Sequence, residues 1–446
     1  MISVGLSESH RKVYNELKVQ DSLYTVVSKK PNGLSKIRVI GSVLDCLQAP
    51  NETAEVIKLI SSNEIKMISL TIKEGNYHFN NSFTKLNVED AQIQYDLLTA
   101  TGPTRLPRTP VGMLVAGLYE RYKLRGKPVS VLCIDNLIRG GEISRVMVET
   151  FAVHRFPMDT GFHLWLASNV FYPNSMCDRI CLTDPLPDSI ALQQIAGIRD
   201  KALVTTESFK DWVLEKWMGD KPEGMEEAGV RFVSSSVPYE NLKIRLNYGT
   251  RLSVAIMSYA LGYVKFEDAL RDPTVTHFMK AYMDEAANGL GSEMPKDVNL
   301  EEYKSHLVIR MSTKQLKYMT RRVAEDASTK LKMDWKPVLE SLDPAAPTKV
   351  IGLAIAAWVH LLAATPIVKA KGFHPLSDNM LDKLEPVANR LVDSASTKDA
   401  QHAALEFLNL IFGSDAGFVQ KLSPAVVKAL QAIQSKGLRE AITAIC

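Results

Sequence analysis

The sequence has few cysteines, little net charge and no long apolar run, and each absence excludes a class of protein. The 446 residues include five cysteines, whose spacing matches no zinc-binding or other metal-site pattern. The formal net charge is +3, with 23% charged residues, which does not favour binding to nucleic acid. No apolar stretch is long enough to span a membrane, and no signal peptide is evident. We therefore expect a cytoplasmic protein that binds neither nucleic acid nor membrane and holds no metal.

The first half of the chain alternates between strand-like and helix-like segments. Ile65–Ile72 is a β-branched run, and Val129–Ile134 has the composition of a buried strand. Thr53–Ser61 and Gly112–Arg125 have helical spacing of apolar residues. This alternation predicts a mainly parallel sheet connected by crossover helices.

The second half, from about Pro238, has helical patterns almost throughout. We therefore predict an α/β domain over residues 1–235, followed by a mainly helical domain over residues 236–446. The helices expected in the second domain are Thr276–Ala287, Leu300–Leu331, Val350–Leu362, Met380–Val392, Asp399–Phe412 and Pro424–Ile442.

One helix is expected over Val237–Tyr263, and it carries polar residues on an otherwise apolar background. Glu240, Lys243, Asn247 and Arg251 recur at steps of three and four, which places them on one face. A lysine held against a buried surface has its charged form disfavoured and can accept a proton near neutral pH. The alternative is that Lys243 extends its ammonium into water and pairs with Glu240.

The segment PYENLKIRLN, residues 238–247, resembles the helix that carries the catalytic lysine in the polyol-specific long-chain dehydrogenases. That family includes mannitol 2-dehydrogenase, arabinitol dehydrogenase and the fructuronate/mannonate reductases. The resemblance implies a Rossmann-like N-terminal domain, a helical C-terminal domain, an NAD cofactor and a monomer. Its strongest match is FYPNSMCDRI at 171–180, and the other matches follow in the family's order: QDSLYTVV at 20–27, VIGSV at 39–43, ISLTIKEGNY at 68–77, CIDNL at 133–137, ESFKDWVLE at 207–215 and GVRFV at 229–233.

The N-terminus departs from the pattern of a dinucleotide-binding sheet. Such a sheet needs a strand, a glycine-rich turn and a helix that holds the pyrophosphate, but no G-x-G-x-x-G lies near Met1. By the resemblance, Ile2–Leu6 matches the second strand of the family, so we expect the first βα unit to be absent, through a truncated gene model or loss of the phosphate cradle. Glu8, just past this strand, could accept a hydrogen bond from the ribose 2′-OH and favour NAD over NADP. The alternative for Glu8 is pairing with the helix dipole.

Polar residues also follow the next two predicted strands. Thr71 lies at the end of the first of them, Glu74 follows it, and both are candidate cofactor contacts, because ligands bind at the carboxyl ends of parallel strands. Asn136 matches a family asparagine that helps to hold the alcohol or carbonyl oxygen, a role that suits a fixed neutral donor. For both groups, a side-chain-stabilised turn is the alternative.

Asp178 and Arg310 are candidate substrate contacts. Asp178, together with Asn174 and Arg179, could bind a polyol or order the catalytic helix, whereas the alternative is a purely structural charge network. By the resemblance, Arg310 aligns with a family arginine that contacts substrate hydroxyls. A solvated helix face is the alternative for Arg310, because other basic residues follow it.

The resemblance implies hydride transfer between the secondary alcohol of a polyol and a nicotinamide, without a metal. Lys243 would be the general base, Glu240 would relay the proton to water, and Asn136 would polarise the reacting oxygen.

Two positions on the catalytic helix differ from the family. Read without a gap, the family asparagine falls on Tyr248 and the family histidine falls on Arg251. Asn247 lies four residues from Lys243, and it could serve as the catalytic asparagine if the helix winds without a bulge. Arg251 could bind a carboxylate in bidentate fashion. Two alternatives therefore remain: a sugar-acid oxidoreductase of the mannonate/fructuronate type, and a catalytically inactive relative that acts as a binding protein.

Overall fold

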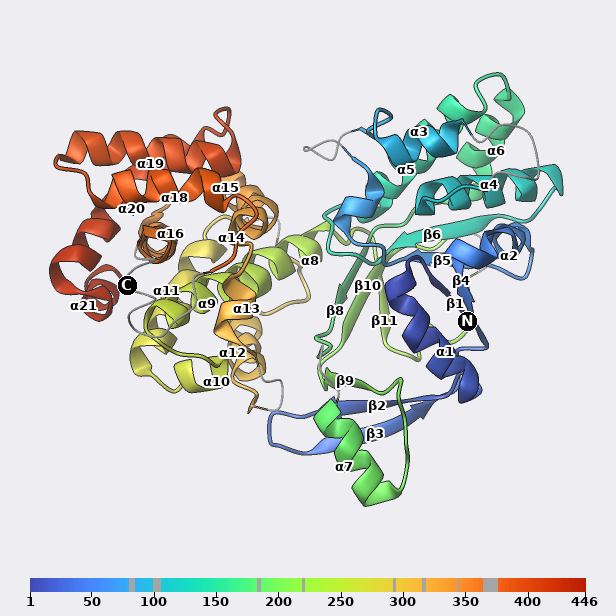
Figure 1. Ribbon diagram of the computed structural model, residues 1–446, viewed down its shortest axis with the longest axis horizontal. Helices are drawn as coiled ribbons and strands as arrows, with labels where there is room; N and C mark the ends of the chain where they lie inside the picture. The colour runs from blue at the N-terminus through green and yellow to red at the C-terminus, as the bar shows by residue number, and fades with distance from the viewer. Residues whose placement is uncertain are drawn as a thin grey trace. The chain divides into compact units, whose positions relative to one another are not determined.

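The computed structural model describes residues 1–79, 85–98, 106–182, 186–218, 221–291, 294–314, 318–342, 345–363 and 376–446. The chain forms two compact units (Figure 1). Unit 1 comprises Met1–Lys30 and Leu34–Glu240, and unit 2 comprises Pro31–Gly33 and Asn241–Cys446. Unit 1 alternates strands and helices and unit 2 is helical, so the predicted fold class is confirmed.

Parallel strands form the centre of unit 1. Strand β1 (Ile2–Gly5) pairs in parallel with β4 (Asp45–Gln48). Strands β5 (Met67–Leu70), β6 (Val129–Cys133) and β7 (Val170–Phe171) form a second parallel sheet in that order. All five residues of β6 are buried, as expected for a parallel strand that is covered on both faces.

Helices connect these strands and cover the sheets. Helix α2 (Ala49–Ser61) packs closely on α4 (Pro110–Lys123), and a Cβ atom at Gly117 would lie 2.5 Å from the side chain of Ile60. Glycine is therefore required at this helix crossing. Helix α5 (Gly140–Arg155) packs on β6 and α4 (Figure 1). The remaining helical segments of unit 1 before Val237 are η1 (Glu8–His10), α1 (Arg11–Val19), η2 (Glu74–Tyr77), α3 (Ala91–Leu97), α6 (Thr160–Asn169) and α7 (Leu186–Ala196).

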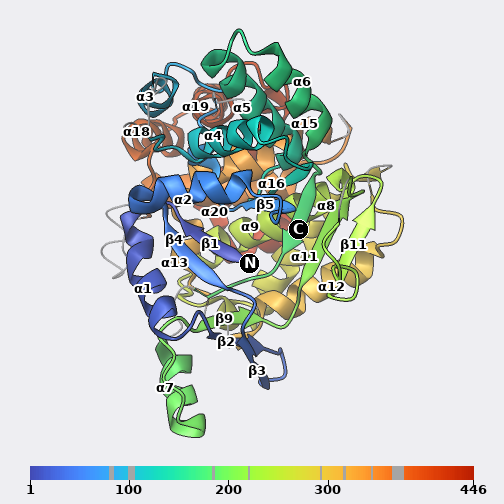
Figure 2. The same cartoon turned by 90° about the vertical axis from the view of Figure 1, so that its right-hand side faces the viewer.

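Two further sheets of unit 1 are mixed rather than parallel. In each, the central strand has one antiparallel and one parallel neighbour. Figure 2 shows the strands of one of these sheets, β2, β3 and β9, near α7. The expectation of a mainly parallel sheet therefore holds for β1–β4 and β5–β6–β7 only. The mixed sheets are β3 (Ser35–Ile40), β2 (Tyr24–Lys29) and β9 (Val204–Glu207), and β11 (Val230–Val233), β10 (Asp211–Glu215) and β8 (Ser175–Asp178).

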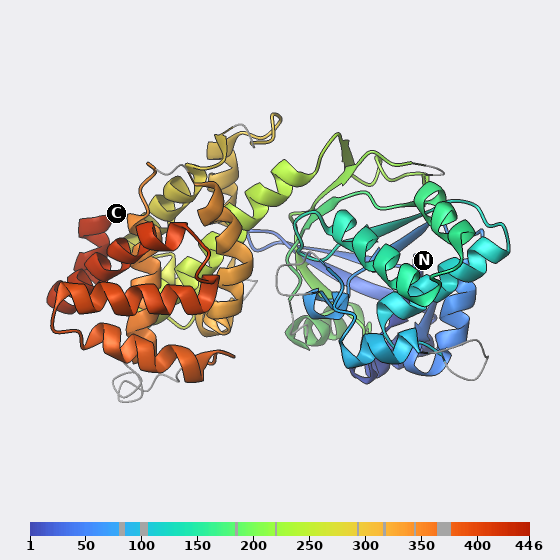
Figure 3. The same ribbon diagram turned by 90° about the horizontal axis from the view of Figure 1, so that it is seen from above.

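Helix α16 (Lys349–Ala363) is the centre of unit 2. It is apolar on nearly all sides, and Trp358 has no exposed surface. A helix of this kind is stable only when other helices surround it. The helices that pack against it are α9 (Gly249–Ala260), α11 (Pro273–Ala287), α18 (Leu381–Val392) and α20 (Phe418–Lys436). The Trp358 ring meets that of Phe407 edge-on at 5.4 Å between centroids. Figure 3 shows helices α18 to α20 of this unit side by side in orange and red.

Two of the predicted helices of unit 2 are wrong in extent. The helix expected over Leu300–Leu331 is divided into α12, α13 and α14, because Ser312 and Thr313 bond back to carbonyls at the end of α12 and Asp326 is left-handed, with φ of 50°. Pro424 lies inside α20, and Gly437, with φ of 85°, separates it from α21. The helices are α9 (Gly249–Ala260), α10 (Phe266–Ala269), α11 (Pro273–Ala287), α12 (Leu300–Met311), α13 (Thr320–Ala324), α14 (Ala327–Lys330), α15 (Lys336–Ser341), α18 (Leu381–Val392), α19 (Thr397–Phe412), α20 (Phe418–Lys436) and α21 (Leu438–Ile445).

Candidate functional site

The helix expected over Val237–Tyr263 consists of three consecutive segments with different winding. Helix α8 (Val237–Leu242) leads into a π-helix, η3 (Lys243–Tyr248), and then into α9. In a π-helix the hydrogen bonds join residues five apart, and such segments are frequent at functional sites. Tyr248, not Asn247, therefore lies one turn beyond Lys243. The condition for Asn247 to face the lysine, a helix without a bulge, is not met, and its catalytic role stays a prediction.

Lys243 is buried within unit 2. Its exposed fraction is 6%, so the alternative that its ammonium extends into water is wrong. The Nζ atom lies over the ring of Tyr248, 5.2 Å from the centroid, and the Cζ atom of Arg251 lies 4.5 Å from the same centroid. Both distances are within the range of cation–π attraction.

Arg251 is held by groups of its own unit. Its guanidinium makes a side-chain hydrogen bond with Tyr318 and lies near the carboxylate of Asp334. Burial by itself would lower the pKa of Arg251, but Tyr248, Tyr318 and Asp334 together raise it above its ordinary value. Asp334 belongs to a second π-helix, η6 (Leu331–Trp335), which packs against η3. The predicted role of Arg251 in binding a substrate carboxylate is therefore in competition with Asp334.

Arg310 lies in the last turn of α12 with an exposed fraction of 6%. The alternative that it belongs to a solvated helix face is wrong, because its side chain is taken out of water. Its contact with substrate stays a prediction.

Glu240 is buried and positions the start of the catalytic helix within unit 1. Its Oε1 atom accepts a hydrogen bond of 2.6 Å from the hydroxyl of Ser236, and its Oε2 atom accepts one of 2.7 Å from the backbone N–H of Arg139. Arg139 has a left-handed backbone, with φ of 55°, at the N-terminal end of α5. The carboxylate therefore joins α8 to the loop that follows β6.

Two of the segments that match the family, FYPNSMCDRI and ESFKDWVLE, contribute structural hydrogen bonds beside this loop. The side-chain oxygen of Asn174 accepts from the backbone N–H groups of Gly141 and Glu142, at 2.9 and 3.2 Å, so Asn174 caps α5. Glu215 accepts from the backbone N–H groups of Asn174 and Ser236. The expectation that Asn174 binds a polyol has no support here, since its oxygen is engaged by the helix.

The carboxyl ends of β5 and β6 are tied together by Asp135. Its carboxylate accepts from the backbone N–H groups of Ile72 and Lys73, at 2.8 and 3.2 Å, and from the hydroxyl of Tyr77 at 3.0 Å. The hydroxyl oxygen of Tyr77 also lies 2.9 Å from the thiol sulfur of Cys133, and burial raises the pKa of that thiol to about 12. None of these three residues was predicted as a site residue, although Cys133 and Asp135 lie in the matched segment CIDNL and Tyr77 ends the matched segment ISLTIKEGNY.

This network places two of the predicted residues at the strand ends of unit 1. Thr71 directly follows β5 and Asn136 directly follows Asp135, and both side chains are exposed. They are thus accessible to a ligand at this edge of the sheet. Glu74 begins η2, but its side chain lies outside what the structure describes.

Glu8 begins η1 just after β1 and is exposed. Its carboxylate pairs with the guanidinium of Arg11 at 2.8 Å, with both side chains about half in water. An exposed carboxylate can exchange such a partner for a ligand hydroxyl at little cost. Both predictions for Glu8 therefore stay open: pairing with the helix dipole, and a hydrogen bond with the ribose 2′-OH.

Asp178 ends β8 with an exposed fraction of 5%. It lines a pocket of about 480 Å³ beside the β8–β10–β11 sheet, together with Cys177, Arg179 and Trp212. The guanidinium of Arg179 donates to Ser28 and to the carbonyl of Glu207.

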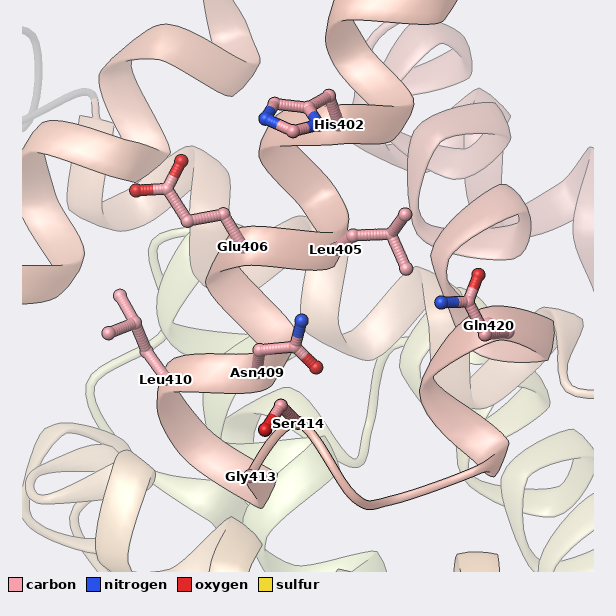
Figure 4. A pocket seen from close by; sticks show the side chains of 8 residues that line it. All are labelled: His402, Leu405, Glu406, Asn409, Leu410, Gly413, Ser414 and Gln420. Atoms are coloured by element: carbon pink, nitrogen blue, oxygen red, sulfur yellow. The ribbon is translucent and has the colours of Figure 1, made fainter.

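A second pocket lies on the surface of α19 and the start of α20 (Figure 4). His402, Glu406 and Asn409 project towards it from one face of α19. None of the predicted site residues lines this pocket, so it has no part in the candidate site.

Within the described ranges, no three histidine, cysteine, aspartate or glutamate side chains gather in a way that could hold a metal ion. Over the same residues, no helix combines the length and apolar character needed to cross a membrane.

Comparisons with known proteins give the same family for both units. The family model described as the mannitol dehydrogenase Rossmann domain matches residues 1–223, and the mannitol dehydrogenase C-terminal domain matches residues 236–434. A mannitol 2-dehydrogenase of Emericella nidulans is 30% identical over 98% of this chain and 84% of the relative.

Two solved structures are similar to the whole chain. The mannitol 2-dehydrogenase of Pseudomonas fluorescens, in a ternary complex with NAD and D-mannitol, is 27% identical with a TM-score of 0.82, covering 99% of this chain and 86% of that one. A D-sorbitol dehydrogenase in substrate-free form is 26% identical with a TM-score of 0.81, covering 99% and 88%.

Proposed function

This chain belongs to the mannitol dehydrogenase family, and from that premise we propose that it is an NAD-dependent oxidoreductase of polyols. It would transfer a hydride between the secondary alcohol carbon of a mannitol-like or arabinitol-like substrate and the nicotinamide. The observation that carries this proposal is a buried lysine on the π-helical turn of the catalytic helix.

Lys243 is the proposed general base. With an exposed fraction of 6%, its amine is largely separated from water, and Arg251 adds a second cation on the same Tyr248 ring. The amine would take the hydroxyl proton as the hydride leaves the carbon, so the alcohol is activated without a metal ion.

Glu240 is proposed to pass the proton on. It stands three residues before Lys243 in the same run of helix, and its carboxylate is fixed by Ser236 and Arg139. Ser236 supplies a hydroxyl, which can both donate and accept a proton. Asn136 would donate to the reacting oxygen from the end of β6.

Two predicted residues of unit 1, Glu8 and Thr71, carry hydrogen-bonding groups of the kind that a dinucleotide needs. The exposed carboxylate of Glu8 at the end of β1 can accept from ribose hydroxyls, and the exposed Thr71 lies at the end of β5. The nicotinamide, when bound, supplies the hydride acceptor or donor. NAD is favoured over NADP because a carboxylate beside the ribose would repel a 2′-phosphate.

A neutral polyol is favoured over a sugar acid. Arg251 is the residue expected to hold a carboxylate, but it already faces Asp334 and Tyr318. A substrate carboxylate at this place would have to displace Asp334 or lie beside it. We also propose that residues 1–235 and 236–446 are two domains, a division that the two family matches, 1–223 and 236–434, support. The protein is proposed to be a monomer.

The test is oxidation of NADH by the full chain against a panel of ketoses and keto-uronates, with Lys243→Ala as the control. Calorimetry with NAD runs alongside. Turnover of a ketose that Lys243→Ala abolishes supports the proposal. Absence of NAD binding together with absence of turnover points to the inactive relative, and turnover of keto-uronates alone points to the sugar-acid enzyme.

A further inference from the structure

The aromatic ring of Tyr248 lies beside two charged side chains of the same run of helix. Among the described residues, its ring is approached by two cationic side chains, Lys243 at 5.2 Å and Arg251 at 4.5 Å from the centroid. Lys243 is five residues earlier in the chain and Arg251 is three residues later. Along the helix the ring therefore comes between the two charges.

This arrangement depends on the π-helical turn. In an α-helix, residues five apart are rotated by roughly 140° around the axis, so the side chains of residues 243 and 248 would point to different sides. In η3 the hydrogen bonds join residues five apart. The extra residue in this turn thus brings the ring over the amine.

Arg251 holds the ring from the other end. It makes a side-chain hydrogen bond with Tyr318 and lies near Asp334. Asp334 is part of η6, the second π-helix, and η6 packs against η3. The guanidinium is therefore anchored by groups outside its own helix, and its planar face can keep the phenol ring in one orientation.

We propose that the ring of Tyr248 is a positioning residue for Lys243: anchored by Arg251 and Asp334, it holds the lysine amine in one place. The inference rests on the proposed function for its catalytic meaning, because Lys243 is there the general base. The two contacts themselves do not depend on which substrate is used. The property at issue is the flat aromatic surface, and the hydroxyl is not required for it.

The first test measures the lysine directly. The full chain and the variants Tyr248→Phe and Tyr248→Leu are labelled with trace acetic anhydride, and the modification of Lys243 is quantified by peptide mass spectrometry against the other lysines. Tyr248→Phe keeps the aromatic surface and should label as the parent chain does. Tyr248→Leu frees the amine, and the labelling rate of Lys243 should rise by about fivefold or more.

The second test is kinetic. Tyr248→Leu should lower kcat by about tenfold with little change in KM, because the base is misplaced while the substrate contacts remain. Tyr248→Phe, which keeps the aromatic ring, should have the kcat of the parent chain. Arg251→Met should raise the labelling rate of Lys243 and lower kcat as Tyr248→Leu does. Arg251→Lys should show smaller changes in both quantities. These two variants test the proposal if Tyr248→Leu does not fold.

The proposal is overturned if Lys243 labels equally fast in all the folded variants, or if Tyr248→Phe behaves as Tyr248→Leu does. Thermal unfolding of each variant identifies those that are folded. If the parent chain turns over no polyol while the labelling pattern is as expected, the proposed function fails and the positioning of Lys243 stands.

Discussion

The backbone N–H of Arg139 donates a hydrogen bond of 2.7 Å to the carboxylate of Glu240, a residue 101 positions further along the chain. Within unit 1, this bond joins the loop after β6 to the first residues of α8. The other carboxylate oxygen is held by Ser236. A single buried side chain thus holds the start of α8 against the loop after β6.

Replacing Glu240 by alanine should destabilise the protein. The backbone N–H of Arg139 would lose its acceptor in a partly buried place, and the hydroxyl of the buried Ser236 would lose its acceptor as well, which together cost about 1–3 kcal/mol. Glu240→Gln should lose much less, because its amide oxygen can still accept from Arg139. Urea unfolding of the three proteins measures the difference, and equal midpoints for alanine and the parent chain would contradict this role.

Replacing Lys243 by alanine should lower kcat by about 10²- to 10⁴-fold, the usual effect of losing a general base. Lys304→Ala is the matched control, because Lys304 is also a buried lysine of unit 2 but pairs with Asp284 and Glu301. It should change stability and leave kcat within about twofold. Steady-state kinetics with NADH and the best ketose makes the comparison; similar losses in both variants would remove the special role of Lys243.

Stability should fall at alkaline pH because of Cys133. Burial raises the pKa of its thiol to about 12, whereas a thiol in the unfolded chain has a pKa of about 8.5. The stability that comes from the protonated native thiol is therefore fully present below about pH 8.5 and is lost as the pH rises towards 12. The loss at full titration is about 5 kcal/mol.

Unfolding midpoints measured from pH 8 to 11 test this expectation. Cys133→Ala removes the titrating group, so its midpoint should fall less steeply with pH than that of the parent chain. Cys181→Ala, at an exposed cysteine, should keep the parent slope. Identical slopes for all three proteins would show that Cys133 does not contribute.

Replacing Glu8 by alanine should weaken NADH selectively. The loss of one hydrogen bond to the ribose raises the KM for NADH by roughly 2- to 10-fold, and removal of the negative charge should lower the KM for NADPH. The ratio of kcat/KM values for NADH and NADPH is the quantity to compare. Arg11→Ala, which removes only the partner of Glu8, should keep the preference for NADH, and an unchanged ratio in Glu8→Ala would leave Glu8 with its helix-start role alone.

Local patterns were sufficient for much of the fold. The strand predicted at Val129–Ile134 is β6, and the helix predicted at Val350–Leu362 is α16. In both, a run of apolar residues is buried on all sides, so composition alone indicates the element. The helix predicted at Leu300–Leu331 failed because the breaks at Thr313 and Asp326 depend on single side-chain and backbone conformations.

The sequence by itself determined the family, the order of the domains and the position of the lysine, because these follow from motifs and periodicity within short segments. Only the tertiary structure decided that Tyr248 rather than Asn247 lies over Lys243, since the π-helical turn rotates every later residue. It also decided that Glu240 faces Arg139 and that Arg251 faces Asp334. Contacts between residues that are remote in the chain depend on packing and on the burial of charge, so local propensity does not predict them.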